Sequence, residues 1–130
     1  MTSNLSGGCL CGAVRYEISG DPVFQLLCFC KDCLAISGTD GYAGYMVNEG
    51  DFRHISGNPT VHMRSSAAGR QVHRHFCGTC GSNLWGQIEL GLISVAAGTL
   101  DDPNHFKPTK KVFVDDAPPW ARIPDHLEIM

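Results

Sequence analysis

The chain has 130 residues, with ten Lys and Arg against thirteen Asp and Glu, and a formal net charge of −3. This length suits one domain spanning residues 1–130, and the weak negative charge argues against nucleic acid or an anionic membrane as a partner. No stretch approaches the roughly 18 consecutive apolar residues of a membrane span, and residues 1–8 lack the basic and apolar regions of a secretory signal. We therefore expect a cytoplasmic protein.

Apolar and polar residues alternate along most of the chain with a period of two, which is typical of half-buried strands. In the first such segment, residues 13–19, the side chains of Val14, Tyr16 and Ile18 fall on one face. Turn residues separate the further predicted strands, which are Val23–Cys28, Tyr42–Val47, Phe52–Ile55, Thr60–Arg64, Gln71–Phe76, Asn83–Glu89, Leu92–Ala97 and Val112–Val114. Strands without alternating helices predict an all-β domain of antiparallel sheets.

Little helix is expected. Only Lys31–Ser37 has room for a helical turn or two, and Gly38 would end it. The last segment, Asp115–Met130, contains three prolines, so it is predicted to lie over the domain as an irregular segment.

The seven cysteines form three tight groups. A thiolate is a soft ligand that selects zinc or an iron–sulfur cluster. Four thiolates close a structural zinc site, whereas three leave one coordination position open. Seven cysteines divide naturally into four plus three, which predicts two zinc ions per monomer. The groups are Cys9-Leu-Cys11, Cys28-Phe-Cys30-Lys-Asp-Cys33 and Cys77-Gly-Thr-Cys80-Gly81.

A disulfide framework is the competing interpretation. An odd number of cysteines would leave one thiol over, and neighbours at positions i and i+2 are poor disulfide partners. A thioredoxin-type motif would need a neighbouring βαβ unit, which the pattern does not predict. In a cytosolic chain, closely spaced cysteine pairs favour metal binding.

The first and last groups are predicted to form one closed zinc site. If Cys9 and Cys11 lie on a strand, both sulfurs point to one side and Leu10 packs on the other. Cys77 and Cys80 form a zinc knuckle, whose turn ends at a glycine. Together the four cysteines would join the start of the chain to a late segment, which is a structural role.

The middle group, Cys28, Cys30 and Cys33, has no fourth cysteine to complete it. The fourth ligand is left open between water, a substrate thiolate, a histidine and a carboxylate. A second structural site is the plainer alternative to an open, catalytic zinc. A lone histidine on a strand is more often a surface residue than a ligand, so none of the six histidines is assigned to the metal.

No proton carrier can be chosen from the sequence. His73, His75 and Asp32 are candidates by residue type, although each is also explained as a surface polar residue. Aromatic residues could line a pocket, but core packing explains them equally well; these are Tyr42, Tyr45 and Trp85.

These motifs resemble the glutathione-dependent formaldehyde-activating family, which includes centromere protein V. The resemblance covers Gly8 to Asp125 and follows the family's order. Beside the three cysteine motifs, two further segments resemble the family, namely Ala97–Pro103 and Pro119–Asp125. The family often has histidine where this chain has Phe29. That position is not a thiolate ligand, so metal binding is expected to be retained, while substrate fit is the property that would change.

The resemblance implies a β-tent fold and the same division of the zinc sites, with Cys9, Cys11, Cys77 and Cys80 structural. It also implies a carbon–sulfur lyase or synthase that adds a glutathione-like thiol to formaldehyde or another small aldehyde. A non-catalytic zinc module that binds a thiol, a small molecule or a protein is the alternative. The chain has no second catalytic motif that would separate the two.

Overall fold

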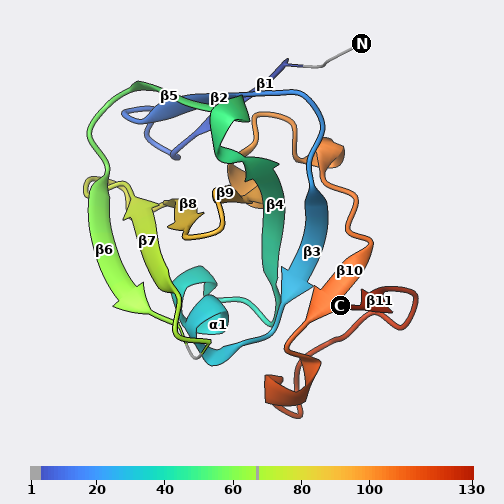
Figure 1. The fold of residues 1–130 in the computed structure, drawn as a ribbon. Helices are drawn as coiled ribbons and strands as arrows, with labels where there is room; N and C mark the ends of the chain where they lie inside the picture. Colours follow the sequence, from blue (N-terminus) through green and yellow to red (C-terminus); the bar gives the residue numbers. More distant parts are fainter. Residues whose placement is uncertain (1–3, 67) are drawn as a thin grey trace.

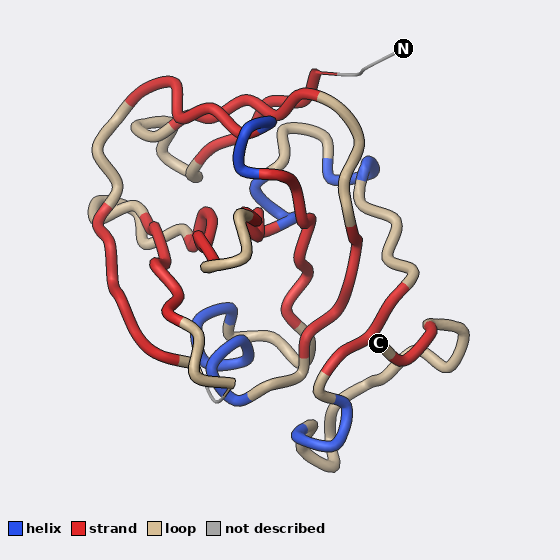
Figure 2. The backbone as a smooth tube through the Cα atoms, in the orientation of Figure 1, coloured by secondary structure: helices blue, strands red, loops and turns tan. Residues whose placement is uncertain are grey.

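The structure is a computed structural model that describes residues 4–66 and 68–130. Strands dominate this part of the chain, together with short helices (Figure 2). The strands are β1 (Asn4–Gly8), β2 (Arg15–Ser19), β3 (Phe24–Cys28), β4 (Tyr42–Asn48), β5 (Phe52–Ser56), β6 (Thr60–Ser65), β7 (Gln71–Phe76), β8 (Asn83–Ile88), β9 (Leu92–Ala96), β10 (Lys110–Val112) and β11 (Glu128–Ile129). The helices are α1 (Lys31–Ser37) and the 3-10 helices η1 (Glu49–Asp51), η2 (Ala97–Thr99), η3 (Pro103–His105) and η4 (Val114–Asp116).

The strands form two sheets, as Figure 1 shows. The smaller sheet has the order β1-β2-β5, and the larger has the order β11-β10-β3-β4-β9-β8-β7-β6. In the view of Figure 1, the smaller sheet lies across the top and α1 lies below, between β7 and β4. The predicted all-β fold of antiparallel sheets is confirmed. None of the helices in the described ranges is long and apolar enough to cross a membrane.

One part of the larger sheet is parallel rather than antiparallel. Strand β10 runs parallel to both of its neighbours, β3 and β11. A parallel pair needs a long crossover, and here the chain between β3 and β10 passes through most of the other strands. A strand of three residues is too short to show an alternation of apolar and polar side chains, so its partner strands could not be predicted.

The main core lies between the two sheets. Val14, just before β2, and Tyr16 and Ile18 of β2 are 1%, 0% and 1% exposed, which confirms the predicted inward face. They pack with residues of the larger sheet that include Val47 and Trp85. Full burial of each such side chain contributes about 1.5–3 kcal/mol, so this layer holds the sheets together.

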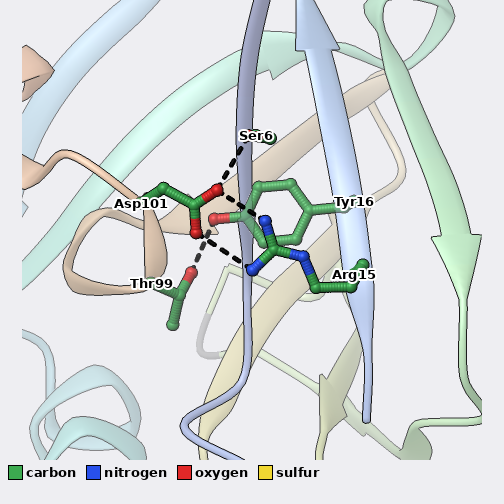
Figure 3. A network of polar contacts seen from close by, with 5 residues as sticks. All are labelled: Ser6, Arg15, Tyr16, Thr99 and Asp101. Carbon is green, nitrogen blue, oxygen red and sulfur yellow. Dashed lines mark hydrogen bonds and ion pairs between the residues drawn. The ribbon is translucent and has the colours of Figure 1, made fainter. Parts of the chain in front are cut away.

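A polar network ties β1 and β2 to the segment after β9 (Figure 3). The guanidinium of Arg15 makes two hydrogen bonds to the carboxylate of Asp101, which also accepts one from Ser6. The hydroxyl of Thr99 donates to the carbonyl of Ala96, so it accepts the 2.7 Å hydrogen bond from the buried Tyr16 hydroxyl. These contacts fix the smaller sheet, and with it the turn between β1 and β2, against the segment after β9.

The prediction that Cys9 and Cys11 lie on a strand is wrong. They lie in the turn between β1 and β2, where the amide of Gly12 donates to the carbonyl of Cys9. Gly12 has φ +81°, a conformation that glycine adopts readily. Leu10 is 90% exposed at the tip of this turn rather than packed behind the cysteines.

The other elements follow the predictions with small shifts. Helix α1 has the predicted bounds, and Gly38 ends it with φ +67°. The predicted strand Val112–Val114 is instead Lys110–Val112, because Phe113 takes a left-handed conformation with φ 55° and stops the extended chain. The predicted irregular segment 115–130 contains only the end of η4 and the two-residue strand β11 among its regular elements.

Candidate metal centres

Four cysteines come together where the two sheets meet. The turn between β1 and β2 supplies Cys9 and Cys11, and the turn between β7 and β8 supplies Cys77 and Cys80. All four sulfur atoms lie within 4.8 Å of one another. The Sγ atoms of Cys9 and Cys11 are 3.6 Å apart, and those of Cys11 and Cys77 are 3.7 Å apart. The structure therefore joins the two pairs that the sequence analysis combined.

Backbone and hydroxyl groups point at these sulfurs. The amide of Val14 donates to the Sγ of Cys9 at 3.2 Å, and the amide of Cys80 donates to the Sγ of Cys77 at 3.5 Å. Contact with Ser82, 3.2 Å from the Sγ of Cys80, is the largest cause that lowers the pKa of that thiol to about 5. Donors directed at sulfur favour the thiolate, which is the form that binds metal.

The four-cysteine cluster fits zinc. With zinc–sulfur bonds of about 2.3 Å, a tetrahedral site separates its sulfurs by about 3.8 Å. The measured separations of 3.6 and 3.7 Å are close to that value. They are far longer than the roughly 2.05 Å of a disulfide, and all seven cysteines are free.

The second cluster forms where β3 passes into α1. Cys28 is the last residue of β3, and Cys30 caps α1 by accepting a hydrogen bond from the amide of Cys33. The Sγ atoms of Cys28 and Cys30 are 3.5 Å apart, and all three sulfurs lie within 4.8 Å of one another. A strand end and a helix start thus gather three thiols within six residues.

The three thiols lie close enough to change one another's acidity. Hydrogen bonds with Cys28 and Cys33 lower the pKa of the Cys30 thiol, whereas contacts with Cys28 and Cys30 raise the pKa of Cys33. Among residues 4–66 and 68–130, no histidine, carboxylate or further cysteine joins this group as a fourth ligand. The cluster could hold a metal ion with three sulfurs, and the protein groups described leave one tetrahedral position free.

Two of the residues singled out from the sequence lie beside this cluster. Tyr42 is the register partner of Cys28 and packs against the cysteines, with its hydroxyl 3.0 Å from the Oγ of Ser94. Burial raises the pKa of Tyr42, so its hydroxyl stays protonated. Asp32, in the first turn of α1, forms an ion pair of 3.2 Å with Arg64 of β6.

The other candidates lie on the opposite face of the larger sheet. Tyr45 and Trp85 belong to the core between the sheets, so core packing is the role the structure gives them. His75 stacks on Trp85 with ring centroids 4.7 Å apart, and burial lowers the pKa of His75. His73 lines an open recess of about 250 Å³ whose lining contains no cysteine. Neither histidine is brought to a cysteine cluster.

Phe29, which separates the first two cysteines of the second cluster, is turned into the protein. Its side chain is 0% exposed, and its amide donates to the carbonyl of Val112. The ring lies against Gly41, where an added Cβ would stand 3.1 Å from a ring carbon. The fully buried ring therefore packs against the residue that precedes β4.

The sequence analysis missed Arg74 of β7, a charged residue that the structure buries to 8% exposed. Its strand neighbours at i−2 and i+2, Val72 and Phe76, are apolar and share its face. This alternation was the available signal, since a period of two places Arg74 on the apolar side of the strand.

The fold and the two sites define a β protein with two cysteine clusters that could hold metal ions. The sequence model of the family described as "Glutathione-dependent formaldehyde-activating enzyme" matches residues 4–116. The chain belongs to this family, as the resemblance of its cysteine motifs indicated.

The chain is also similar to individual known proteins. A protein of Halomonas elongata named "Putative glutathione-dependent formaldehyde-activating enzyme" is 32% identical over 126 residues, which cover 92% of this chain and 80% of that protein. The crystal structure of a Rhodobacter sphaeroides protein superimposes with a TM-score of 0.61 over 77% of this chain and 93% of that chain. At 22% identity, the second similarity concerns the fold alone.

Proposed function

We propose that the chain is a zinc-dependent carbon–sulfur lyase or synthase that adds a glutathione-like thiol to a small aldehyde. The reaction site is the cluster of Cys28, Cys30 and Cys33. The observation that carries this proposal is the gathering of three sulfurs without a fourth protein ligand among the described residues. Membership in a family named for glutathione-dependent formaldehyde activation supports the choice of substrates.

The two clusters are proposed to have different roles. Cys9, Cys11, Cys77 and Cys80 would hold a structural zinc, because four sulfurs leave no free position. The three-cysteine cluster would hold the second zinc and accept a thiol. Since free thiols persist in a reducing compartment, we also propose a cytoplasmic location.

The reaction forms one carbon–sulfur bond. The sulfur of the thiol attacks the carbonyl carbon, and the thiol proton ends on the aldehyde oxygen, which gives a hemithioacetal. A zinc ion bound at the cluster supplies the positive charge that keeps a thiol as thiolate near neutral pH. Tyr42, whose pKa is raised by burial, stays neutral beside the cluster and packs against it.

Metal analysis and NMR test this proposal together. Protein purified in reduced form should bind two zinc ions per monomer, with the second filled by added zinc if it is lost during purification. Exchange NMR of mixed glutathione and formaldehyde should show faster hemithioacetal formation with the protein than without it. Cys30→Ser should remove this acceleration while its thermal melt shows a folded protein.

Two results would contradict the proposal. One zinc per monomer after zinc addition would refute the two-site assignment. Exchange at the uncatalysed rate, together with normal zinc content, would instead favour a non-catalytic zinc module.

A further inference from the structure

Arg74 is buried without a carboxylate partner. Within residues 4–66 and 68–130, no carboxylate lies within 4.0 Å of its guanidinium, although the side chain is only 8% exposed. In these residues, every side-chain nitrogen or oxygen without a hydrogen-bond partner is in contact with solvent. The unpaired guanidinium of Arg74 is therefore still reached by solvent. A buried charge without a partner costs free energy. A ligand that brings an anion to this opening would recover that free energy.

The register of the larger sheet places Arg74 on the face that carries the three-cysteine cluster. Arg74 is opposite Gly86 of β8, and Gly86 is opposite Ser94 of β9. The Oγ of Ser94 bonds to the hydroxyl of Tyr42, which is the register partner of Cys28. Residues directly opposite one another share a face. Because Gly86 has no side chain, nothing from this position of β8 separates Arg74 from the Ser94–Tyr42 pair.

Helix α1 brings the cluster toward this part of the sheet. Arg64 of β6 shares the face of Arg74, and its ion pair of 3.2 Å with Asp32 ties the β6–β7 hairpin to the first turn of α1. Figure 1 shows α1 between the β7 and β4 sides of the sheet. The guanidinium therefore lies on the face of the larger sheet that also carries Tyr42 and Cys28, and α1 is tied to the hairpin that carries Arg74.

We propose that Arg74 binds the carboxylate of an acidic thiol whose sulfur lies at the three-cysteine cluster. This inference rests on the proposed function, because it places a thiol at that cluster. The planar guanidinium presents two parallel donors to a carboxylate, a geometry that a neutral group cannot match. Burial already orders the Arg74 side chain, so little further freedom is lost when the anion binds. Arg74 is thus a residue that selects thiols by their charge.

A different role for Arg74 would be to offset the negative charge of the cysteine sulfurs. That role predicts that removing the charge weakens metal retention and the binding of every thiol alike. Selection of an acidic ligand predicts instead a loss confined to thiols that carry a carboxylate. Two small probes separate these roles, since 3-mercaptopropionate is anionic and 2-mercaptoethanol is neutral.

The experiment titrates both probes into the full-length protein loaded with cobalt(II), following the thiolate-to-cobalt absorption. The wild type should bind 3-mercaptopropionate at least about tenfold more tightly than 2-mercaptoethanol, equivalent to about 1.4 kcal/mol. Arg74→Gln should abolish this preference while leaving the affinity for 2-mercaptoethanol unchanged, and Arg74→Lys should keep part of it. The matched control is Arg70→Gln, which removes an exposed charge from the β6–β7 turn and should leave the preference intact.

Each outcome decides between the interpretations. Equal affinities of the wild type for both probes would overturn the inference without any variant, even if Arg74→Gln failed to fold. An unchanged preference in folded Arg74→Gln would also overturn it, as would an equal loss for both probes. In these cases the thiol-binding site itself would stand. Absence of any spectral response to either probe would instead refute the proposed function.

Discussion

Removing one sulfur from each cluster should damage the protein to different degrees. In the four-cysteine cluster, Cys11 and Cys77 are 66 positions apart, and a cross-link closing a loop of that length restricts the unfolded chain by about 4 kcal/mol. The same relation gives about 2 kcal/mol for the six-residue loop from Cys28 to Cys33. We therefore expect Cys77→Ser to lose about twice as much stability as Cys33→Ser.

Thermal melts of the zinc-loaded proteins measure this difference. For a domain of this size, each kcal/mol shifts the melting temperature by about 3–5 °C. The loss should then be roughly 15 °C for Cys77→Ser and roughly 8 °C for Cys33→Ser. Zinc content is measured in the same samples, because the reasoning requires that each substitution releases its own ion. Wild-type protein stripped of zinc should melt no higher than Cys77→Ser.

Two outcomes of this comparison would contradict the reasoning. If both variants release one zinc and melt at the same temperature, loop length does not determine the role of each site. The division into a structural and a functional cluster would then be wrong. A lower melting temperature for Cys33→Ser than for Cys77→Ser would reverse the assignment.

Three further predictions concern the contacts that hold the smaller sheet. Tyr16→Phe should lower the free energy of unfolding by about 1 kcal/mol. Thr99→Val should lower it more, because it leaves the buried hydroxyl of Tyr16 without an acceptor. Urea melts compare the two variants, and equal losses would contradict the assigned direction of the hydrogen bond. Gly7→Ala should destabilise the protein in the same assay, since its Cβ would stand 2.3 Å from the Tyr16 hydroxyl oxygen, and a neutral result would contradict this packing. The hydrogen bond from Arg15 lowers the pKa of Asp101 in the folded protein. The ionised Asp101 therefore stabilises the fold fully above the ordinary carboxyl pKa, and this stabilisation is lost as the pH falls through the lowered pKa of the folded state. When the pH is lowered below about 4, the free energy of unfolding should therefore fall less for Asp101→Asn than for the wild type. Parallel curves of unfolding free energy against pH would refute this linkage.

The strands were predictable where one face is buried and the other is exposed to solvent. Tyr16 and Ile18 alternate with exposed residues, so periodicity identified both the strand and its inward face. Strand β1, Asn4–Gly8, was not predicted, because a sequence ending in Ser-Gly-Gly has low strand propensity. Pairing with β2 makes it a strand, and pairing is a property of the fold.

The division of the cysteines into a group of four and a group of three was predictable, because the spacing of metal-binding cysteines is restricted. The local conformation of Cys9 and Cys11 was not, since a strand and a tight turn can each bring two such sulfurs to one side. For Arg74, the alternation indicated the buried face of its strand but not what lies beside it. Its place on the sheet face that carries the cluster depends on how β7, β8, β9 and β4 are ordered, and no local pattern encodes that order.

The two halves of the four-cysteine cluster each arise from a local turn, and this has a consequence for the order of folding. The β1–β2 turn and the β7–β8 turn close over a few residues, so each hairpin can form within microseconds. Joining them requires a contact between residues 66 positions apart, about half of the chain, and contacts of high sequence separation form slowly. If the cluster binds zinc as proposed, the ion can bind one preformed cysteine pair early and the other later. We therefore expect the folding rate to depend on free zinc concentration, with the ion acting as a reactant in assembly.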